Sequence, residues 1–226
     1  MANVERASYR AFLSEGVSEE GLATAVEGVT REAQALVDEG ALLTAAMSRS
    51  GRELFLYLEH VFEGGAPDMD AVRSLPCARG WLEGLLQPIP QHTGDVAWAY
   101  MFPVFWFDKP QGVGQFARAR RPDERCGRIA RLLPNKLMEY VTHHQAIVAE
   151  GLLVGDRYQF ISIHDDMLYS YIEKPRDRER VNIRRLDEPS AEIGRWLDAD
   201  PASHFDQELA GGHDFVFIDT LMSCGR

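Results

Sequence analysis

The sequence predicts an α+β protein made of two tandem βαββαβ units, because its two halves repeat the same pattern. Residues 54–59 (LFLYLE) and 168–173 (LYSYIE) are short strand-like runs, and both end in glutamate. Each run is followed by a loop and then by a helical segment that contains tryptophan, Trp81 in the first half and Trp196 in the second. A pattern repeated within one chain indicates a repeated structural unit.

The remaining elements follow in the same order in each half. In the first half we expect strands at residues 9–13, 41–47 and 54–59, helices at 18–39 and around 79–82, and a closing aromatic strand within 96–107. The second half repeats this with strands at 128–133, 158–163, 168–173 and 214–220 and helices at 135–150 and around 195–197. The order is that of the ferredoxin-like fold. Pro103 interrupts the first closing strand, so we expect a bulge or an edge position there.

The domain organisation follows from the need to cover each sheet. A four-stranded sheet with two helices on one face leaves its other face bare, and that face must be buried. We therefore expect the two units, residues 1–108 and 125–226, to pack sheet to sheet as an intrachain dimeric α+β barrel, with a ligand cavity between the sheets. Residues 109–124 are rich in proline, glycine and arginine, lack periodicity and are predicted to form a linker.

Composition excludes several classes of function. The chain has 226 residues, 35 acidic and 24 basic side chains, and a net charge of -11. Such an acidic chain is a poor match for nucleic acid or for an anionic membrane surface. The most apolar run, 96–107, is shorter than the roughly 18 residues needed to span a bilayer, and the first ten residues lack the apolar stretch of a signal peptide. Three scattered cysteines form no disulfide framework, so we expect a cytoplasmic protein.

The helix at 135–150 carries the first candidate pair for acid–base chemistry. Tyr140 and His144 are four residues apart and share the helix face that also carries Leu137, Val141 and Val148. A phenol and an imidazole side by side on a half-buried face have the chemistry of an acid/base pair. The alternative is that both rings simply fill the contact between helix and sheet.

Other candidates lie around the strands of the second half. His164 precedes Asp165 at a predicted hairpin, where aspartate needs no catalytic role, and no metal-ligand spacing is present. Glu59 and Glu173 end equivalent strands and are expected to be exposed unless they face the cavity. Candidate ligand-binding residues besides Glu173 are Arg157, Tyr158 and Trp196. The arginines at 118, 120, 121 and 125 are expected to lie on a solvated loop.

The second half resembles the L-rhamnose mutarotase family over roughly residues 126–222. Residues 131–150 (RLLPNKLMEYVTHHQAIVAE) match that family's Leu-x-Pro, Glu-Tyr and histidine pattern at Tyr140, His144 and Glu150, whereas Val148 stands where the family has tryptophan. The resemblance implies that His144 is the acid/base group of sugar anomer exchange. The resemblance also implies that Tyr140 is the partner of His144 at the sugar, and that Tyr158 and Trp196 form walls of the pocket. The first half has no tyrosine or histidine at the matching helix positions.

Residues 155–173 (GDRYQFISIHDDMLYSYIE) are similar to the small ferredoxin-like aromatic polyketide cyclases. His164 and Asp165 match that family's His-Asp pair, and Ser170 or Tyr171 replaces its second histidine. This resemblance implies that His164 assists an aldol-type cyclisation.

Three hypotheses therefore stand. The leading one is a cofactor-independent isomerase, a sugar mutarotase-like protein with its site in the second half. The alternatives are a polyketide cyclase or cofactor-free monooxygenase-like enzyme, and a non-catalytic small-ligand-binding barrel. All three predict a small-molecule ligand, either a sugar or a polycyclic compound, in a monomer or homodimer that needs no metal and no cofactor.

Overall fold

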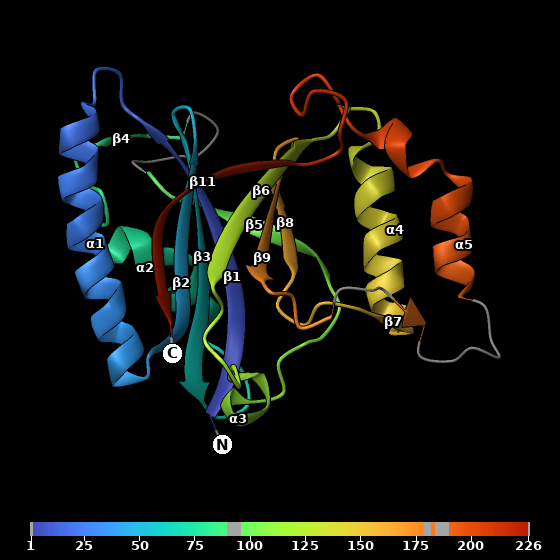
Figure 1. Cartoon of the computed structure of the whole chain (residues 1–226), viewed down its shortest axis with the longest axis horizontal. Helices are drawn as coiled ribbons and strands as arrows, with labels where there is room; N and C mark the ends of the chain where they lie inside the picture. Colours follow the sequence, from blue (N-terminus) through green and yellow to red (C-terminus); the bar gives the residue numbers. More distant parts are fainter. Residues whose placement is uncertain (1, 90–95, 179–181, 184–189, 226) are drawn as a thin grey trace. The chain divides into compact units, whose positions relative to one another are not determined.

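The computed structural model describes residues 2–89, 96–178, 182–183 and 190–225 (Figure 1). It confirms an α+β protein whose strands pair antiparallel. The chain divides into two compact units. Unit 1 comprises Met1–Met101, Pro110–Pro122 and Ile218–Arg226, and unit 2 comprises Phe102–Lys109 and Asp123–Phe217.

Unit 1 is an antiparallel sheet with α-helices on one face (Figure 1). Strand β1 pairs with β3, β3 pairs with β2, the first residues of β5 pair with β1, and most of β11 pairs with β2. The bounds of its elements are β1 Ala2–Leu13, α1 Glu19–Glu39, β2 Leu42–Ser50, β3 Glu53–Glu63, α2 Met69–Ala78, β4 Leu86–Gln87, β5 Ala99–Trp106, α3 Val113–Phe116 and β11 Val216–Gly225.

Helix α1 begins and ends at residues suited to those positions. The side chain of Ser18 accepts a hydrogen bond from the backbone N–H of Gly21, which satisfies one of the free donors of the first turn. Gly40 ends the helix in the left-handed conformation at φ 82°, which glycine adopts without strain. The buried side chains recur every three or four residues and form one apolar stripe against the sheet: Leu22, Val26, Val29, Ala33, Leu36 and Val37.

Unit 2 also contains an antiparallel sheet, which is smaller than that of unit 1. Strand β6 pairs with β9, β9 pairs with β8 in a hairpin, and β8 pairs with the later residues of β5. Helices α4 and α5 lie side by side (Figure 1). The bounds of its elements are β6 Glu124–Arg131, α4 Leu137–Glu150, β7 Leu153–Val154, β8 Phe160–His164, β9 Met167–Lys174, β10 Asn182–Ile183, α5 Ala191–Asp198 and the 3-10 helix η1 Pro201–His204.

Strand β5 shows the irregularity expected from its proline. Its pairing with β8 shifts register between Pro103 and Phe105, which confirms the predicted bulge. Proline has no N–H to donate, so a regular ladder is interrupted at that position.

The segment predicted to be a linker has structure of its own. Pro110–Pro122 belong to unit 1 and include the four-residue helix α3. Phe116 is fully buried, and Arg118 forms an ion pair with the equally buried Glu59. The expectation that all the arginines of this region are solvated is therefore wrong for Arg118, whose side chain is 4% exposed.

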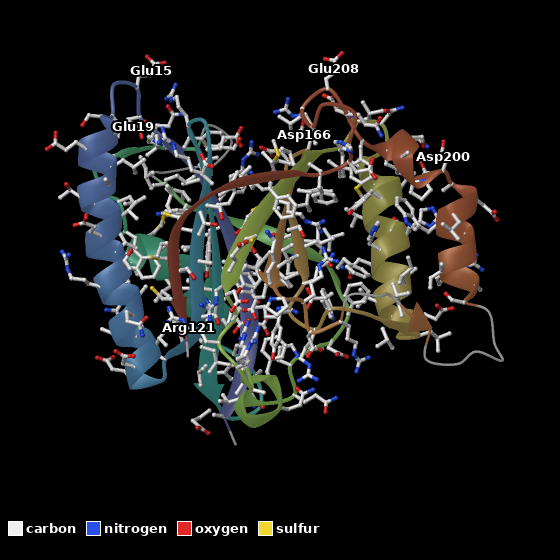
Figure 2. All side chains as sticks on the ribbon, viewed as in Figure 1. Glu15, Glu19, Arg121, Asp166, Asp200 and Glu208 are labelled. Carbon is white, nitrogen blue, oxygen red and sulfur yellow. The ribbon has the colours of Figure 1, made fainter. Side chains whose placement is uncertain are left out.

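Each sheet has one apolar face and one polar face, because successive strand residues point to opposite sides. In unit 1 the helix face carries Tyr9 and Leu56, and the opposite face carries Arg6, Ser8 and Tyr57. These polar residues are nevertheless buried. The side chains of Glu15 and Glu208 instead point outward into solvent (Figure 2), and Glu19 and Arg121 are exposed as well.

Within the described ranges, no helix has both the length and the apolar character needed to cross a membrane.

Candidate functional site

The predicted pair on α4 is brought together as its spacing indicates. The rings of Tyr140 and His144 stack with centroids 3.9 Å apart, and both side chains are buried. His144 Nδ1 lies 2.9 Å from the carbonyl oxygen of Tyr140. A carbonyl only accepts, so Nδ1 carries the proton and Nε2 is the unprotonated nitrogen of the neutral ring. Burial lowers the pKa of His144 to about 4, so the ring is neutral at physiological pH.

Further aromatic rings surround this pair. Trp196 on α5 meets His144 edge-on at 4.7 Å, and His204 on η1 lies 4.7 Å from the same tryptophan. Phe205 contacts Tyr140 at 5.7 Å. We call these five residues the aromatic cluster. The sequence predicted the grouping of Tyr140, His144 and Trp196, but His204 and Phe205 were given no role, because only the folded chain brings η1 to α4.

The aromatic cluster lies on the helix face of the unit 2 sheet. Tyr140 packs in the same apolar core as Ile161, Ile163 and Leu168. Glu150, a residue of the mutarotase-like motif, accepts hydrogen bonds from the Ser190 hydroxyl and the Ala191 backbone at the start of α5. These contacts are those of a packed helix–sheet interface, which was the alternative interpretation of this helix face.

His164 lies on the opposite face of the same sheet. Ile161 and Ile163 point into the core beneath α4, so their neighbours Ser162 and His164 point the other way. The His164 side chain is 11% exposed, and its Nδ1 lies 3.4 Å from Oδ2 of Asp165 in the predicted hairpin turn. Asp165 adopts a left-handed φ of 56°, which a tight turn requires and aspartate tolerates.

Strand β9 adds a carboxylate and two phenols to this face. Glu173 is 2% exposed, so its expected exposure at a strand end is wrong. It accepts a hydrogen bond of 2.6 Å from the hydroxyl of Tyr171, and its Oε1 lies 3.5 Å from Nε of Arg125, the residue opposite it on β6. Arg125 is thus another arginine that is buried rather than solvated. Tyr169 lies opposite Ser162 on the same face. We call this set the polar face of unit 2: Arg125, Ser162, His164, Tyr169, Tyr171 and Glu173.

The predicted site residues therefore do not form one site. The backbone of the sheet separates His144 and Tyr140 on one face from His164 and Glu173 on the other. Tyr158 and Arg157 precede β8: Tyr158 is buried, its backbone N–H donates to Oδ1 of Asp156, and Arg157 Nε lies 3.7 Å from Oδ2 of Asp177.

Unit 1 carries a related arrangement at the matching register. Arg6 lies opposite Glu59 on β1 and β3, as Arg125 lies opposite Glu173 on β6 and β9. Arg6 Nε donates to the Tyr57 hydroxyl at 2.9 Å, and this hydroxyl donates to Glu59 Oε1 at 2.7 Å. Arg118 adds a two-pronged hydrogen bond to the same carboxylate, with Nη2 2.8 Å from Oε1. The sequence comparison of the two halves predicts that Glu59 and Glu173 occupy equivalent strand positions. It does not indicate that Arg6 and Arg118 lie beside Tyr57 and Glu59.

Among the side chains of the described ranges, no group of three or more histidine, cysteine, aspartate or glutamate residues is placed to hold a metal ion.

We compared the chain with known proteins and describe two solved structures to which it is similar. No family model matches the chain, and no curated protein matches it. A provisionally assigned monooxygenase from Lactobacillus acidophilus NCFM is 7% identical, with 99% of this chain and 96% of that chain covered and a TM-score of 0.41. An anthrone oxidase-like protein is 8% identical, with 98% and 92% covered and a TM-score of 0.34. At these identities and TM-scores neither structure assigns an activity to the chain, and neither supports the expected sugar mutarotase.

Proposed function

We propose that the chain is a cofactor-independent small-molecule enzyme of the cyclase or monooxygenase kind, and that it acts on an enolisable polycyclic substrate. The observation that carries this proposal is the polar face of unit 2. It gathers an imidazole, hydroxyls, a carboxylate and a guanidinium on one side of a sheet, away from the apolar core beneath α4. An imidazole can accept a proton from a weakly acidic substrate, and the neighbouring polar groups can stabilise the charge that develops.

In this proposal His164 is the proton acceptor. It removes a proton from a substrate carbon that lies next to a carbonyl group, and the resulting enolate attacks a second carbonyl of the same molecule. The alkoxide that forms takes a proton back, so the cyclisation is balanced without an oxidant. In this proposal the hydroxyls of Ser162 and Tyr169, which lie opposite each other on β8 and β9, donate to the oxygen that gains negative charge. The neighbouring Asp165 carboxylate favours the imidazolium that forms.

His144 is the weaker candidate for this role. Its ring is stacked on Tyr140 and enclosed by Trp196, and burial lowers its pKa to about 4. A base with so low a pKa has little driving force to take a proton from a weakly acidic substrate.

The test measures proton abstraction directly. The chain is incubated in D₂O with anthrone and with 2-tetralone, and NMR follows deuterium exchange at the acidic carbon. We expect the wild type to accelerate exchange and His164→Gln to lose at least about a hundredfold of that acceleration. His144→Gln is the matched control and is expected to keep it. Exchange that survives His164→Gln, or that the wild type does not accelerate, would overturn the proposal.

A second measurement addresses the mutarotase hypothesis on the same preparations. Exchange NMR of L-rhamnose and other hexoses reports anomer interconversion. If the chain accelerates this exchange and His144→Gln abolishes it, a sugar site at the aromatic cluster replaces the proposal. If neither proton transfer nor anomer exchange is accelerated, the binding-only hypothesis takes its place.

We also propose that the two units are tandem ferredoxin-like repeats. The matched register of Arg6 with Glu59 and of Arg125 with Glu173 supports a duplication, because the two pairs occupy equivalent strands in the two units. The Tyr-x-Glu sequence on both β3 and β9 supports it too.

A further inference from the structure

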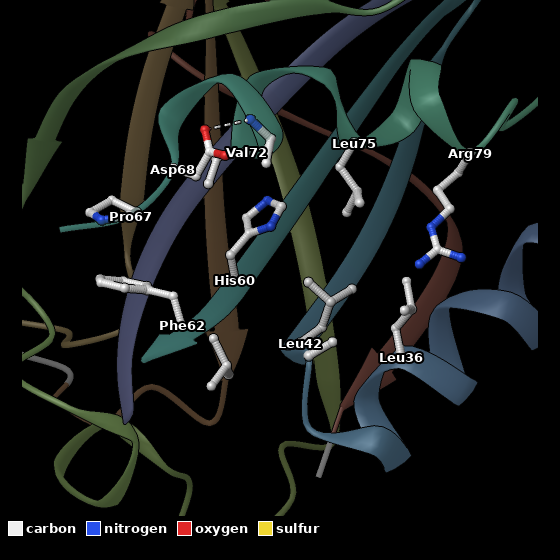
Figure 3. A pocket seen from close by; sticks show the side chains of 12 residues that line it. Leu36, Leu42, His60, Phe62, Pro67, Asp68, Val72, Leu75 and Arg79 are labelled. Carbon is white, nitrogen blue, oxygen red and sulfur yellow. Dashed lines mark hydrogen bonds between the residues drawn. The ribbon is translucent and has the colours of Figure 1, made fainter. Parts of the chain in front are cut away.

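Unit 1 contains a pocket that the proposed function does not use. It has a volume of about 210 Å³ and lies between α2, the end of α1 and the strands β2 and β3 (Figure 3). Its walls are mainly apolar and include Leu36, Leu42, Val61, Phe62, Val72 and Leu75. A cavity of roughly 150 Å³ with apolar walls is large enough to bind benzene. The pocket therefore has room for a single aromatic ring with one or two small substituents.

Two of the polar side chains that line this pocket already have partners. Asp68 Oδ1 accepts hydrogen bonds from the backbone N–H groups of Asp70 and Ala71 at the start of α2. Arg79 Nη1 donates to Glu32 Oε1 at 3.1 Å. Because Asp68 already accepts hydrogen bonds and Arg79 is already ion-paired, the pocket favours an uncharged ligand.

The third polar lining residue, His60, has a defined tautomer. The Tyr9 hydroxyl lies 2.5 Å from the carbonyl oxygen of Val72 and 3.0 Å from His60 Nε2. A phenol has one proton, and the carbonyl can only accept, so Tyr9 donates to Val72. His60 Nε2 must therefore carry a proton and donate to the Tyr9 oxygen. In the neutral ring this leaves Nδ1 as an acceptor.

Burial keeps the His60 ring neutral. The side chain is 8% exposed, and burial lowers the pKa of His60 to about 4. At physiological pH Nδ1 of His60 is thus an unprotonated hydrogen-bond acceptor in a pocket with mainly apolar walls. A ligand without a donor would leave this acceptor unsatisfied, which costs free energy.

We propose that this pocket binds a small uncharged phenol, with its ring against the apolar walls and its hydroxyl donating to Nδ1 of His60. A phenol combines a flat apolar ring with an O–H that is a stronger donor than an aliphatic alcohol, because it is more acidic. The site is independent of the proposed reaction at His164, because all of its lining residues belong to unit 1.

The tautomer is tested first, on the full chain without ligand. A long-range ¹H–¹⁵N correlation spectrum of histidine-labelled protein separates the two ring nitrogens. We expect His60 with a protonated Nε2 and an unprotonated Nδ1 at neutral pH. The opposite tautomer, or a doubly protonated ring, would overturn the proposal.

Ligand binding is then measured by titration of the same protein with p-cresol and with 4-methylanisole, which has a similar shape and no donor. We expect p-cresol to bind about tenfold more tightly, and to shift the Nδ1 resonance of His60. His60→Leu is expected to bind p-cresol only as weakly as 4-methylanisole. Leu75→Trp, which fills the pocket but keeps His60, is expected to abolish binding of both compounds.

Leu209→Trp, at an exposed leucine of unit 2, is the matched control and is expected to bind p-cresol like the wild type. Equal affinity of the wild type for the two compounds would overturn the proposal, as would p-cresol binding that persists in Leu75→Trp. Failure of p-cresol to bind the wild type at its solubility limit would overturn it as well. Because Leu75→Trp leaves the Tyr9–His60 contact in place, the test does not depend on the folding of His60→Leu.

Discussion

At the scale of single residues, Glu59 shows how a buried charge is accommodated. Burial alone would raise the pKa of this carboxyl group, but attraction to Arg118, with its hydrogen bonds, and to Arg6 holds the pKa below its ordinary value. The hydroxyl of Tyr57 adds a further hydrogen bond to the carboxylate. An ionised group without such partners would be costly at this depth, so its arginines are part of the fold.

The Arg118→Ala variant is expected to destabilise the protein by about 3 kcal/mol, because it leaves a buried carboxylate with one of its partners missing. The matched control is Arg49→Ala. Arg49 pairs with Glu19, whose side chain is 78% exposed, so we expect this variant to lose at most about 1 kcal/mol. Urea unfolding measures both values. Equal losses in the two variants would show that the buried pair is no more valuable than the surface one.

Some residue-level features were predictable and others were not. The four-residue spacing of Tyr140 and His144 correctly predicted adjacent rings, because helix geometry fixes it. That spacing does not tell whether a shared face meets a ligand or a protein core. Strand alternation could have shown that His164 and Ile163 point to opposite faces, and so that His164 and His144 do not share a pocket. The partners of Glu59 depend on chain segments far apart in sequence, which no local pattern reveals.

At the scale of elements, helix α1 depends on the residues at its ends as well as on its apolar stripe. Loss of the Ser18 side chain leaves the backbone N–H of Gly21 without its acceptor. We expect Ser18→Ala to reduce the free energy of unfolding by about 1 kcal/mol.

The control for this variant is Ser74→Ala, the same change at an exposed position inside α2, where the serine hydroxyl donates to the Asp70 carbonyl. Alanine is the better helix former there, so Ser74→Ala is expected to be neutral or slightly stabilising. Thermal unfolding of the wild type and of the two variants measures their relative stabilities. A Ser18→Ala variant as stable as Ser74→Ala would mean that the first turn of α1 contributes little.

Most long elements were predictable because their signals are local, but the helix expected around residues 79–82 is wrong, since α2 spans Met69–Ala78 and residues 79–85 form turns. Helix-forming stretches, helix periodicity and strand-like runs are each contained in a short segment of sequence, and they placed α1, α4, β8 and β9 close to their observed bounds. Helix α3 could not be predicted in the same way. It is too short to be stable by itself, and the burial of Phe116 and the ion pair of Arg118 with Glu59 hold it in place.

At the scale of the whole molecule, each unit holds a histidine that burial keeps neutral. These are His60 in unit 1 and His144 in unit 2, and burial lowers both pKa values to about 4. In the unfolded chain each ring titrates near its ordinary value of about 6.5. Between these two values the unfolded chain binds more protons than the folded chain, so the free energy of unfolding rises with pH across this window.

Acidification from about pH 7 to about pH 5 is therefore expected to lower the stability by about 2 kcal/mol for each of the two histidines. This range lies above the ordinary pKa values of the carboxyl groups, so Glu59 contributes little to the change. Urea unfolding at several pH values measures the slope. His60→Leu and His144→Leu are each expected to remove about half of it, because an apolar side chain has no proton to bind in either state. The same substitution at the exposed His213 is expected to leave the slope unchanged. A slope that survives both buried-site variants would mean that other groups drive the acid response and that neither ring is held neutral by the fold.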